Sequence, residues 1–440
     1  MIGWSDTDLI MRDAVRDFID AKVAPHIDDL EHGDMLPYPI ARELWNDFGL
    51  NVMAAEALNG YLARKRKKAE KAAAAESSSA EQSSPVEPVE TKDRKSGGLG
   101  EMGAQLSMGA VILAELAGVT LGTVASVGVS LGLGAATIMS RGTLAQQERW
   151  LPDLVTLDKI AAWAITEPDS GSDAFGGMKT YVRRDGENYV LNGQKTFITN
   201  GPNADVIVVY AKLDPSASLR TGEGDKSVDP RDRKVLTFVL DSGMAGLTQG
   251  KRFRKMGMHS SPTGELFFDD VVLTPDRLLG ETEEHKGGDG RDSARQSFVI
   301  ERVGCAILSL GIINRCHALC VEYSKQRTLW GKNIGQFQLI QLKLAQMEVA
   351  RLNVQNMVFS AIESLQAGKL PTLAESSAMK LYATQAATDV AMEAVQLFGG
   401  NGYMSEYRVE QLARDAKSLM IYAGSNEIQV THIAKGLLAD

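Results

Sequence analysis

The apolar positions of this chain recur at helical spacing near both ends and at strand spacing in the middle. Near the N-terminus Leu9, Val15 and Phe18 belong to a stretch with such spacing that covers 6–58. A second stretch of the same kind covers 104–155. Apolar residues three and four positions apart fall on one face of a helix, so both stretches predict amphipathic helices.

The middle of the chain changes to short runs that are rich in β-branched and aromatic residues. Turn signals such as Asp185-Gly186 and Asn192-Gly193 separate them. The runs predict strands at 181–182, 189–191, 197–199, 206–210, 235–240 and 266–272. We therefore expect an antiparallel, barrel-like β unit here.

Helical spacing returns from Phe298 onward in four long segments, at 298–327, 336–367, 372–398 and 404–437. Long segments with short connections predict a helical bundle. The expected fold class is α+β: an N-terminal helical domain at 1–160, a middle β domain at 161–280 and a C-terminal four-helix bundle at 281–440.

Residues 59–98 differ in composition from the rest of the chain. The segment holds the basic run 64–68, an alanine run, three consecutive serines and two prolines, with hardly any large apolar side chain. Such a segment buries too little surface to offset its ordering entropy, so we predict a disordered insertion. The basic run suits an acidic lipid, a nucleic acid or a protein partner, although a merely solvated run is the commoner case.

The stretch between Glu115 and Arg141 carries no charge and is long enough to span a bilayer. Gly, Ser and Thr interrupt it throughout, and it lacks the aromatic residues that mark a membrane interface. We interpret it as small-residue helices inside the helical domain and expect no stable membrane insertion.

Composition narrows the class of protein further. At 440 residues and 44% hydrophobic the chain can bury a substantial core, and its net charge of −9 argues against binding nucleic acid over the whole surface. Cys305, Cys316 and Cys320 lack CxxC spacing and predict neither a disulfide framework nor a zinc site. With no secretory signal at the N-terminus, a cytoplasmic, reducing location is expected.

No metal-ligand pattern, P-loop, Rossmann glycine motif or nucleophile elbow occurs in the sequence. Five longer segments carry the chemical information. They are AITEPDSGSD (164–173), NGQKTFITNG (192–201), QR followed by Gly331 (326–331), QLFGGNGY (396–403) and IYAGSNEI (421–428). In this order and spacing the chain resembles the acyl-CoA dehydrogenase family over nearly its whole length outside 59–98.

This resemblance implies an oxidoreductase that binds FAD between the β domain and the C-terminal helices. Thr166 and Thr199 would hydrogen-bond the flavin edges, and Phe197 would form a flat apolar wall. Ser172 would lie at the cofactor and contact the CoA side of the substrate. Taken singly, a threonine in a strand is more often structural, so only the paired segments support these roles.

The resemblance also assigns contacts to the rest of FAD. Arg327 would meet the pyrophosphate, since a planar, permanently charged fork suits two phosphate oxygens. The further cofactor contacts would be Gln338, Gln396, Gly399, Gly400, Ser425 and Glu427. In relatives a neighbouring subunit supplies several of these contacts, which implies at least a homodimer and, as in many relatives, a homotetramer.

The position of the catalytic base departs from much of the family. Many members carry a glutamate directly after the tyrosine of the C-terminal turn, where this chain has Ala423, and alanine cannot accept a proton. A second group, which includes isovaleryl- and long-chain acyl-CoA dehydrogenases, carries the base in a Glu-Arg pair at the start of the first C-terminal helix. This chain has Glu301-Arg302 there. Without the surrounding motifs, Glu301 would be interpreted as a first-turn helix acid favoured by the macrodipole.

The predicted chemistry follows from these assignments. Glu301 would remove the α proton, while the backbone N–H of Ala423 would hydrogen-bond the thioester carbonyl and stabilise the developing enolate. Arg302, Tyr422 and Gly424 complete the expected substrate contacts. The product would be a trans-2-enoyl-CoA, as in fatty acid β-oxidation, and the expected electron acceptor is an electron-transfer flavoprotein.

The substrate is less defined by the sequence. The small residues between Gly122 and Gly134 favour a medium-to-long or bulky acyl chain, if that segment lines the acyl tunnel. A branched short-chain substrate and a same-fold flavin hydroxylase or nitroalkane-oxidising enzyme are the alternatives. The linker at 281–295 is unusually polar for the family and bears on the path into the acyl pocket.

Overall fold

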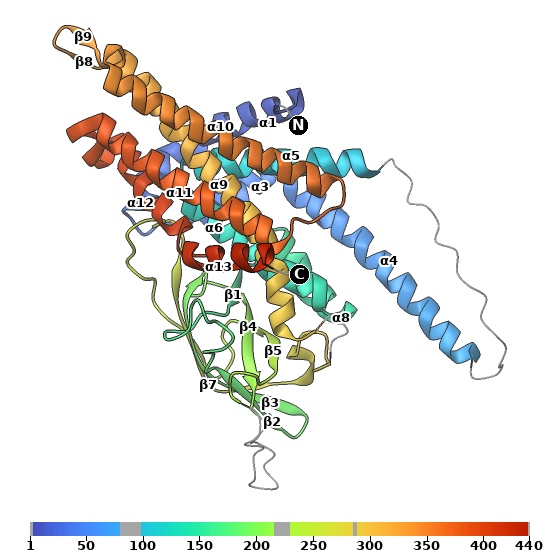
Figure 1. Cartoon of the computed structure of the whole chain (residues 1–440). Coiled ribbons are helices and arrows are strands. Elements are labelled where there is room, and N and C mark those ends of the chain that lie inside the picture. The colour runs from blue at the N-terminus through green and yellow to red at the C-terminus, as the bar shows by residue number, and fades with distance from the viewer. Residues whose placement is uncertain (1–2, 80–97, 215–228, 285–287, 439–440) are drawn as a thin grey trace.

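The computed structural model describes residues 3–79, 98–214, 229–284 and 288–438. Helices form the two ends of the chain and a sheet forms the middle, which confirms the α+β class (Figure 1). The sheet packs below the helices in this view, and the long helix α9 runs from the sheet to the opposite end of the helical part.

The N-terminal part is built from helices whose starts are fixed by local capping. Ser5 and Asp8 form a capping box at the first helix, and Thr143 and Gln146 form another at α8. The helices are α1 (Asp6–Phe18), η1 (Ile19–Val23), η2 (Ala24–His26), α2 (Ile27–Glu31), α3 (Tyr38–Asp47), α4 (Leu50–Ser79), α5 (Gly98–Ala117), α6 (Leu121–Gly128), η3 (Val129–Ala135), α7 (Ala136–Arg141) and α8 (Leu144–Val155).

Helix α4 corrects the prediction for the insertion. Residues 59–79, expected to be disordered, continue this helix, which projects from the body of the molecule (Figure 1). Ala, Lys, Arg and Glu all have high helix propensity, and Leu58 and Leu62 anchor the first half in the core beside α8. The rest of the predicted insertion, 80–97, lies outside the described residues.

Among the described residues, two helical stretches are long and apolar enough to cross a membrane, Leu121–Arg141 and Gly290–Gln326. In each, 61% of the apolar window is buried inside the protein. Their hydrophobicity is therefore used for packing, as expected for the first of them. Gly134 shows why small residues are needed there, since a Cβ at this position would lie 2.5 Å from Cβ of Ala161 in the sheet.

The middle domain is a seven-stranded sheet. Its strands are β1 (Ala161–Ala164), β2 (Tyr181–Asp185), β3 (Asn188–Thr199), β4 (Val206–Leu213), β5 (Val235–Asp241), β6 (Leu247–Gln249) and β7 (Thr263–Leu273). Most neighbouring strands are antiparallel, as predicted, but β4 pairs in parallel with both β1 and β2. The sheet is therefore mixed, and its first strand was not predicted from the sequence.

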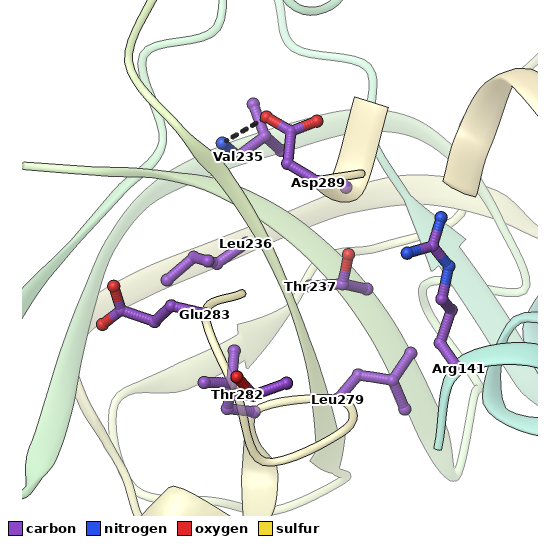
Figure 2. Close-up of a pocket in the computed structure, with 10 residues that line it drawn as sticks. Arg141, Val235, Leu236, Thr237, Leu279, Thr282, Glu283 and Asp289 are labelled. Carbon is purple, nitrogen blue, oxygen red and sulfur yellow. Dashed lines mark hydrogen bonds between the residues drawn. The ribbon is translucent and has the colours of Figure 1, made fainter. Parts of the chain in front are cut away.

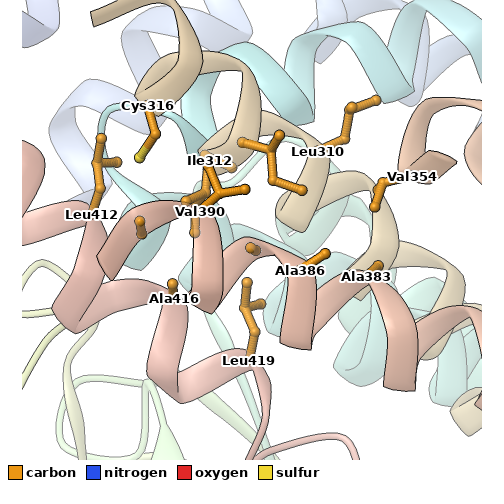
Figure 3. Packing of buried hydrophobic residues seen from close by; sticks show 14 of the residues in the cluster. Leu310, Ile312, Cys316, Val354, Ala383, Ala386, Val390, Leu412, Ala416 and Leu419 are labelled. Atoms are coloured by element: carbon orange, nitrogen blue, oxygen red, sulfur yellow. The ribbon is translucent and has the colours of Figure 1, made fainter. Parts of the chain in front are cut away.

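The C-terminal part holds α9 (Gly290–Gln326), the β8–β9 hairpin (Thr328–Leu329 and Lys332–Asn333), η5 (Ile334–Gln336), α10 (Gln338–Gln366), α11 (Leu373–Phe398), η6 (Gly399–Tyr403), η7 (Ser405–Tyr407), α12 (Val409–Leu419) and α13 (Asn426–Leu437). Side chains of α9, α10, α11 and α12 interlock in one apolar core (Figure 3). All three cysteines are free and buried in this part. The last predicted helical segment is divided into two helices by the turn at 420–425.

The polar linker ends earlier than the sequence pattern predicts, because α9 begins at Gly290. Asp289 caps the helix through Oδ1, which accepts from the Arg291 N–H at 2.8 Å, and its Oδ2 accepts from the Val235 N–H of β5 at 3.3 Å. Val235 and Asp289 line a cavity (Figure 2). Its volume is about 10 Å³. That volume is too small for a cofactor or an acyl chain, so this junction anchors α9 on the sheet.

Candidate active site

Glu301 lies well inside α9, eleven residues after its first residue. The effect of a helix macrodipole is confined to the first and last turns, so it gives no reason for an acid at this position. The interpretation of Glu301 as a first-turn acid is therefore wrong. Instead, the protein buries the Glu301 carboxyl and places two cations, Arg302 and Lys380, around it.

The residue keeps some contact with solvent, but its carboxyl group is surrounded by protein. Burial raises the pKa of the Glu301 carboxyl to about 7, and the positive charges of Arg302 and Lys380 oppose this rise. A carboxylate with a pKa near the working pH can both remove a proton and release it again. Perturbed acids of this kind are concentrated at functional sites.

Arg302 and Lys380 are both buried. Arg302 donates from Nη1 to Ser377 Oγ at 2.9 Å, while its Nε has no partner. Lys380, on α11, donates to the Gly424 carbonyl at 2.9 Å and to Asn426 Oδ1 at 3.0 Å. Burial lowers the pKa of Lys380 to about 8, with Glu301 among the charges that oppose this shift.

The turn that precedes α13 presents free backbone donors. Ala423 and Gly424 have φ values of 56° and 81°, in the left-handed region. Among the hydrogen bonds of the described residues, none uses the N–H of Ala423, Gly424 or Ser425 as a donor. Tyr422 also has a buried hydroxyl without a partner. The turn therefore offers several unpaired donors at partly exposed positions.

Glu427 is the other carboxylate of this segment, at the first turn of α13. A hydrogen bond from its own backbone N–H, together with the Ser425 hydroxyl, lowers the pKa of its side chain. It is exposed to solvent. An acid held ionised in this way is a weak proton acceptor compared with Glu301.

The two segments predicted to line the flavin are held side by side by a buried ion pair. Glu167 and Lys195 lie 2.8 Å apart, and the Thr196 N–H donates to the Thr166 carbonyl at 2.9 Å. The following turn is fixed by Asn200, which donates to the carbonyls of Ser126 and Ala161. The sheet, α6 and these two segments therefore form one rigid unit.

On this unit several groups suit a flat heteroaromatic cofactor. Phe197 is 66% exposed at a φ of 57°, so its ring stands on the surface instead of in the core. The hydroxyls of the half-buried Thr166 and Thr199 bond to nothing among the described residues, and Ser172 is exposed. The indole N–H of the buried Trp163 is also unpaired. An apolar wall with unpaired donors beside it fits FAD.

Trp163 connects this surface to the base. Its ring packs edge-on against Phe298 of α9, with centroids 6.2 Å apart. Phe298 in turn lies 5.9 Å from the Arg302 guanidinium. The end of β1 and the Glu301 segment are therefore neighbours.

Ser425 and Glu427 belong to the start of α13, but the other predicted cofactor contacts lie elsewhere. We call Arg327, Gln338, Gln396, Gly399 and Gly400 the distal cluster. Tyr323, one turn before Arg327, stacks on Phe398 at 4.0 Å, which brings the ends of α9 and α11 together. All five residues are exposed.

Arg327 follows Glu301 by 26 residues of α9, about 39 Å along the axis. Figure 1 shows α9 running from the sheet to the β8–β9 hairpin. An extended FAD molecule cannot span this distance. The distal cluster and the Glu301 site of one chain therefore cannot contact the same cofactor.

Two residues of this site escaped the sequence-based prediction. Trp163 directly precedes the segment 164–173, and a tryptophan in a short buried strand was the available signal. Lys380 gave no signal beyond a lysine among small residues in a helix. Only the fold brings it to Gly424 of the turn, 44 residues later.

Comparisons with known proteins point to one family. Three family models match: acyl-CoA dehydrogenase, N-terminal domain at 93–158, middle domain at 162–271 and C-terminal domain at 288–438. A short-chain-specific acyl-CoA dehydrogenase of Megasphaera elsdenii is 37% identical over 79% of this chain and 85% of its own length. The mitochondrial isovaleryl-CoA dehydrogenase of Arabidopsis thaliana is 34% identical over 72% of this chain and 74% of its own. The crystal structure of an acyl-CoA dehydrogenase from Geobacillus kaustophilus has a TM-score of 0.78 at 31% identity and covers 99% of both chains.

Proposed function

This chain belongs to the acyl-CoA dehydrogenase family of FAD-dependent oxidoreductases, and we propose that Glu301 is the base of its dehydrogenation reaction. The observation that carries the proposal is a carboxyl group whose pKa burial raises to about 7, beside a turn with unpaired backbone donors. The family defines the reaction as the oxidation of an acyl-CoA to a trans-2-enoyl-CoA.

Each protein group has its own role in the dehydrogenation. The Glu301 carboxylate accepts the α proton of the thioester. The Ala423 N–H donates to the thioester oxygen and stabilises the negative charge that develops there. Bound FAD supplies the acceptor for the β hydrogen, which leaves as hydride. Phe197, Thr166 and Thr199 hold the ring system, and Ser172, Arg302, Tyr422 and Gly424 border the substrate.

Glu301 is preferred to Glu427 for physical reasons. Glu427 is stabilised as an anion by its own N–H and by Ser425, so it gains little by taking a proton. Glu301 accepts no hydrogen bond in the described structure and is destabilised as an anion by burial. Exclusion of water by the bound substrate would strengthen this difference.

We further propose that a second copy of the chain completes each FAD site. The distal cluster of one chain would contact the pyrophosphate and adenosine of the FAD bound beside Glu301 of the other, with Ser425 and Glu427 also at the cofactor. Helix α10 supports an association because it exposes an apolar stripe of Leu339, Leu342, Val349 and Leu352. A homodimer is the minimum assembly, and a homotetramer is the form expected from the resemblance.

For the substrate we propose a medium-to-long or bulky acyl-CoA. At Gly128 and Gly132, four residues apart and exposed, an added Cβ would meet no atom within 4 Å, so this face leaves room for an acyl chain. Gly122 and Gly134, in contrast, are small because they pack against neighbouring atoms. A branched short-chain substrate is the alternative that the isovaleryl-CoA relative favours.

Two further proposals concern the surroundings of the enzyme. We propose that an electron-transfer flavoprotein reoxidises the cofactor, in line with the resemblance. A cytoplasmic location is consistent with three buried, unpaired cysteines.

The base assignment is tested by replacing Glu301 with glutamine. Glu301→Gln keeps the shape of the side chain but removes the proton acceptor, so FAD should stay bound while bleaching by acyl-CoA slows by about 10²- to 10⁴-fold. The measurement is the visible spectrum of the purified protein during anaerobic titration. Titrations with butyryl-, isovaleryl-, octanoyl- and palmitoyl-CoA identify the substrate class at the same time.

Glu427→Gln, saturated with FAD, is the matched variant and should still be bleached. If the Glu301 variant were bleached at the normal rate, Glu301 would not be the base. Activity with butyryl- or isovaleryl-CoA alone would contradict the proposed chain length without affecting the base.

A further inference from the structure

The carbonyl groups of the Ala423–Gly424 turn point into the helical bundle. Gln429 donates from Nε2 to the Ala423 carbonyl at 3.1 Å and to the Gly424 carbonyl at 2.6 Å. The Gly424 carbonyl also accepts from Lys380 Nζ at 2.9 Å. In a trans peptide the N–H lies opposite the carbonyl, so the N–H groups of Gly424 and Ser425 face away from these donors. The Ala423 N–H, which we propose as the thioester donor, belongs to the preceding peptide, so Lys380 acts on it through the backbone of the turn.

Lys380 is the only charged donor to this turn among the described hydrogen bonds. It is fully buried on α11, and its second acceptor, Asn426 Oδ1, also accepts from Thr384 Oγ1 at 3.1 Å. Lys380 and Thr384 are one helical turn apart, so α11 holds the start of α13 at two points. A turn with two successive left-handed residues needs such support, because this conformation is strained for a residue with a side chain such as Ala423.

The fit around Gly424 is close. A Cβ at this position would lie 2.9 Å from Gln429 Nε2 and 3.6 Å from Arg302 Nη2. The turn therefore rests against the side chains that hold it, and a shift of Lys380 would be transmitted to the backbone donors on the opposite side.

The same ammonium group acts on Glu301. The titratable groups around this carboxyl are Arg302 and Cys305 on α9, Lys380 on α11 and Tyr422 in the turn, with Glu427 facing Lys380. Burial raises the pKa of Glu301, and Lys380 and Arg302 are the two charges that restrain it. Without Lys380 the base would be protonated at neutral pH in a larger fraction of molecules.

We propose that Lys380 is a positioning residue for α-proton removal: from α11 it holds the Gly424 carbonyl, and with it the turn whose N–H groups are presented to the thioester, while its positive charge acts on Glu301. This inference rests on the proposed role of Glu301 as the base. It assigns to one buried lysine both the geometry of the oxyanion donors and the ionisation of the proton acceptor.

The test compares Lys380→Met with Lys380→Arg in the FAD-loaded enzyme. The substrate is butyryl-CoA or octanoyl-CoA, whichever gives the higher kcat/KM, and the readouts are KM and the pH dependence of kcat/KM. In the wild type kcat/KM should rise with pH through about 7, as Glu301 loses its proton. Lys380→Met should move this rise to higher pH and increase KM about tenfold or more, as a buried charged hydrogen bond is lost.

Lys380→Arg keeps the charge and should return the pH dependence toward that of the wild type. Lys343→Met is the matched control, because Lys343 lies on α10 and pairs with Glu393 instead. Its pH dependence should equal that of the wild type. Gln429→Leu removes the neutral donor to the same carbonyl, so KM should rise while the pH dependence stays unchanged.

A Lys380→Met enzyme with the pH dependence of the wild type would overturn the inference. If that variant does not fold, Lys380→Arg and Gln429→Leu decide: a wild-type KM in Gln429→Leu contradicts the role of the held carbonyl. Glu301→Gln, measured in parallel, separates the two proposals. Normal bleaching of Glu301→Gln refutes the base itself, whereas an inactive Glu301→Gln with an unaltered Lys380→Met refutes only the role of the lysine.

Discussion

Two acids, Glu31 of α2 and Asp415 of α12, are buried where the N-terminal helices, the loop before β7 and the C-terminal helices meet. Asp415 Oδ1 accepts from the Met258 N–H at 2.5 Å, and Glu31 Oε1 accepts from Ser260 Oγ at 3.2 Å. The other oxygens, Glu31 Oε2 and Asp415 Oδ2, accept no hydrogen bond. Burial first, and the charge of Glu31 second, raise the pKa of Asp415. Protonation of Asp415 would remove this repulsion.

From this pair of acids we predict that the stability of the folded protein falls as pH rises. The folded state binds the proton of Asp415 more tightly than the unfolded chain does, so stability is lost between the ordinary aspartate pKa of about 3.9 and the raised value in the folded protein. Asp415→Asn cannot titrate and should flatten this dependence, which thermal unfolding at pH 5 and pH 8 measures. Glu410→Gln on the same helix is the control, because Arg414 lowers the pKa of Glu410. Equal pH dependence in Asp415→Asn and wild type would contradict this role of Asp415.

At the scale of elements, α4 shows where a sequence pattern fails to predict a helix. Its second half has the composition of a disordered segment, because a solvated helix and a disordered chain both lack large apolar side chains. The two anchoring leucines, Leu58 and Leu62, are four residues apart, too few to reveal a helical period. Strand β1 escaped prediction for a related reason: three of its four residues are alanine, and its parallel partner β4 lies more than 40 residues later.

The anchoring of α4 is testable by mutation. Leu62 packs among buried residues that include Ile138, Trp150 and Leu154, so Leu62→Ala should cost about 2–5 kcal/mol of unfolding free energy. Lys67→Ala, on the exposed part of the same helix, should change it by no more than about 0.5 kcal/mol. Thermal unfolding of the two variants compares these effects. Equal midpoints would mean that α4 does not contribute to the core through Leu62.

At the scale of the whole molecule, the order of helical, β and helical parts was predictable because each part keeps one hydrophobic period over many residues. The site was predictable only through motifs, and the structure divides those motifs between two distant places. Chain order gave no sign of this division, since Glu301 and Arg327 lie on the same helix. Lys380 could not be predicted for the opposite reason: it is remote from the turn in sequence but lies next to it in the fold.

The proposed division of the FAD site between two subunits leads to a test with mixed subunits. If Glu301 of one chain works with Arg327 of another, Glu301→Gln and Arg327→Ala homodimers are both inactive for different reasons. A mixed dimer then contains one site with both defects and one with both native residues, because the two sites of a symmetric dimer exchange the same contacts. Random mixing by co-expression should therefore restore about a quarter of the wild-type activity per site. A mixture as inactive as its parents would show that each chain completes its own site, in conflict with the roughly 39 Å that α9 places between the two residues.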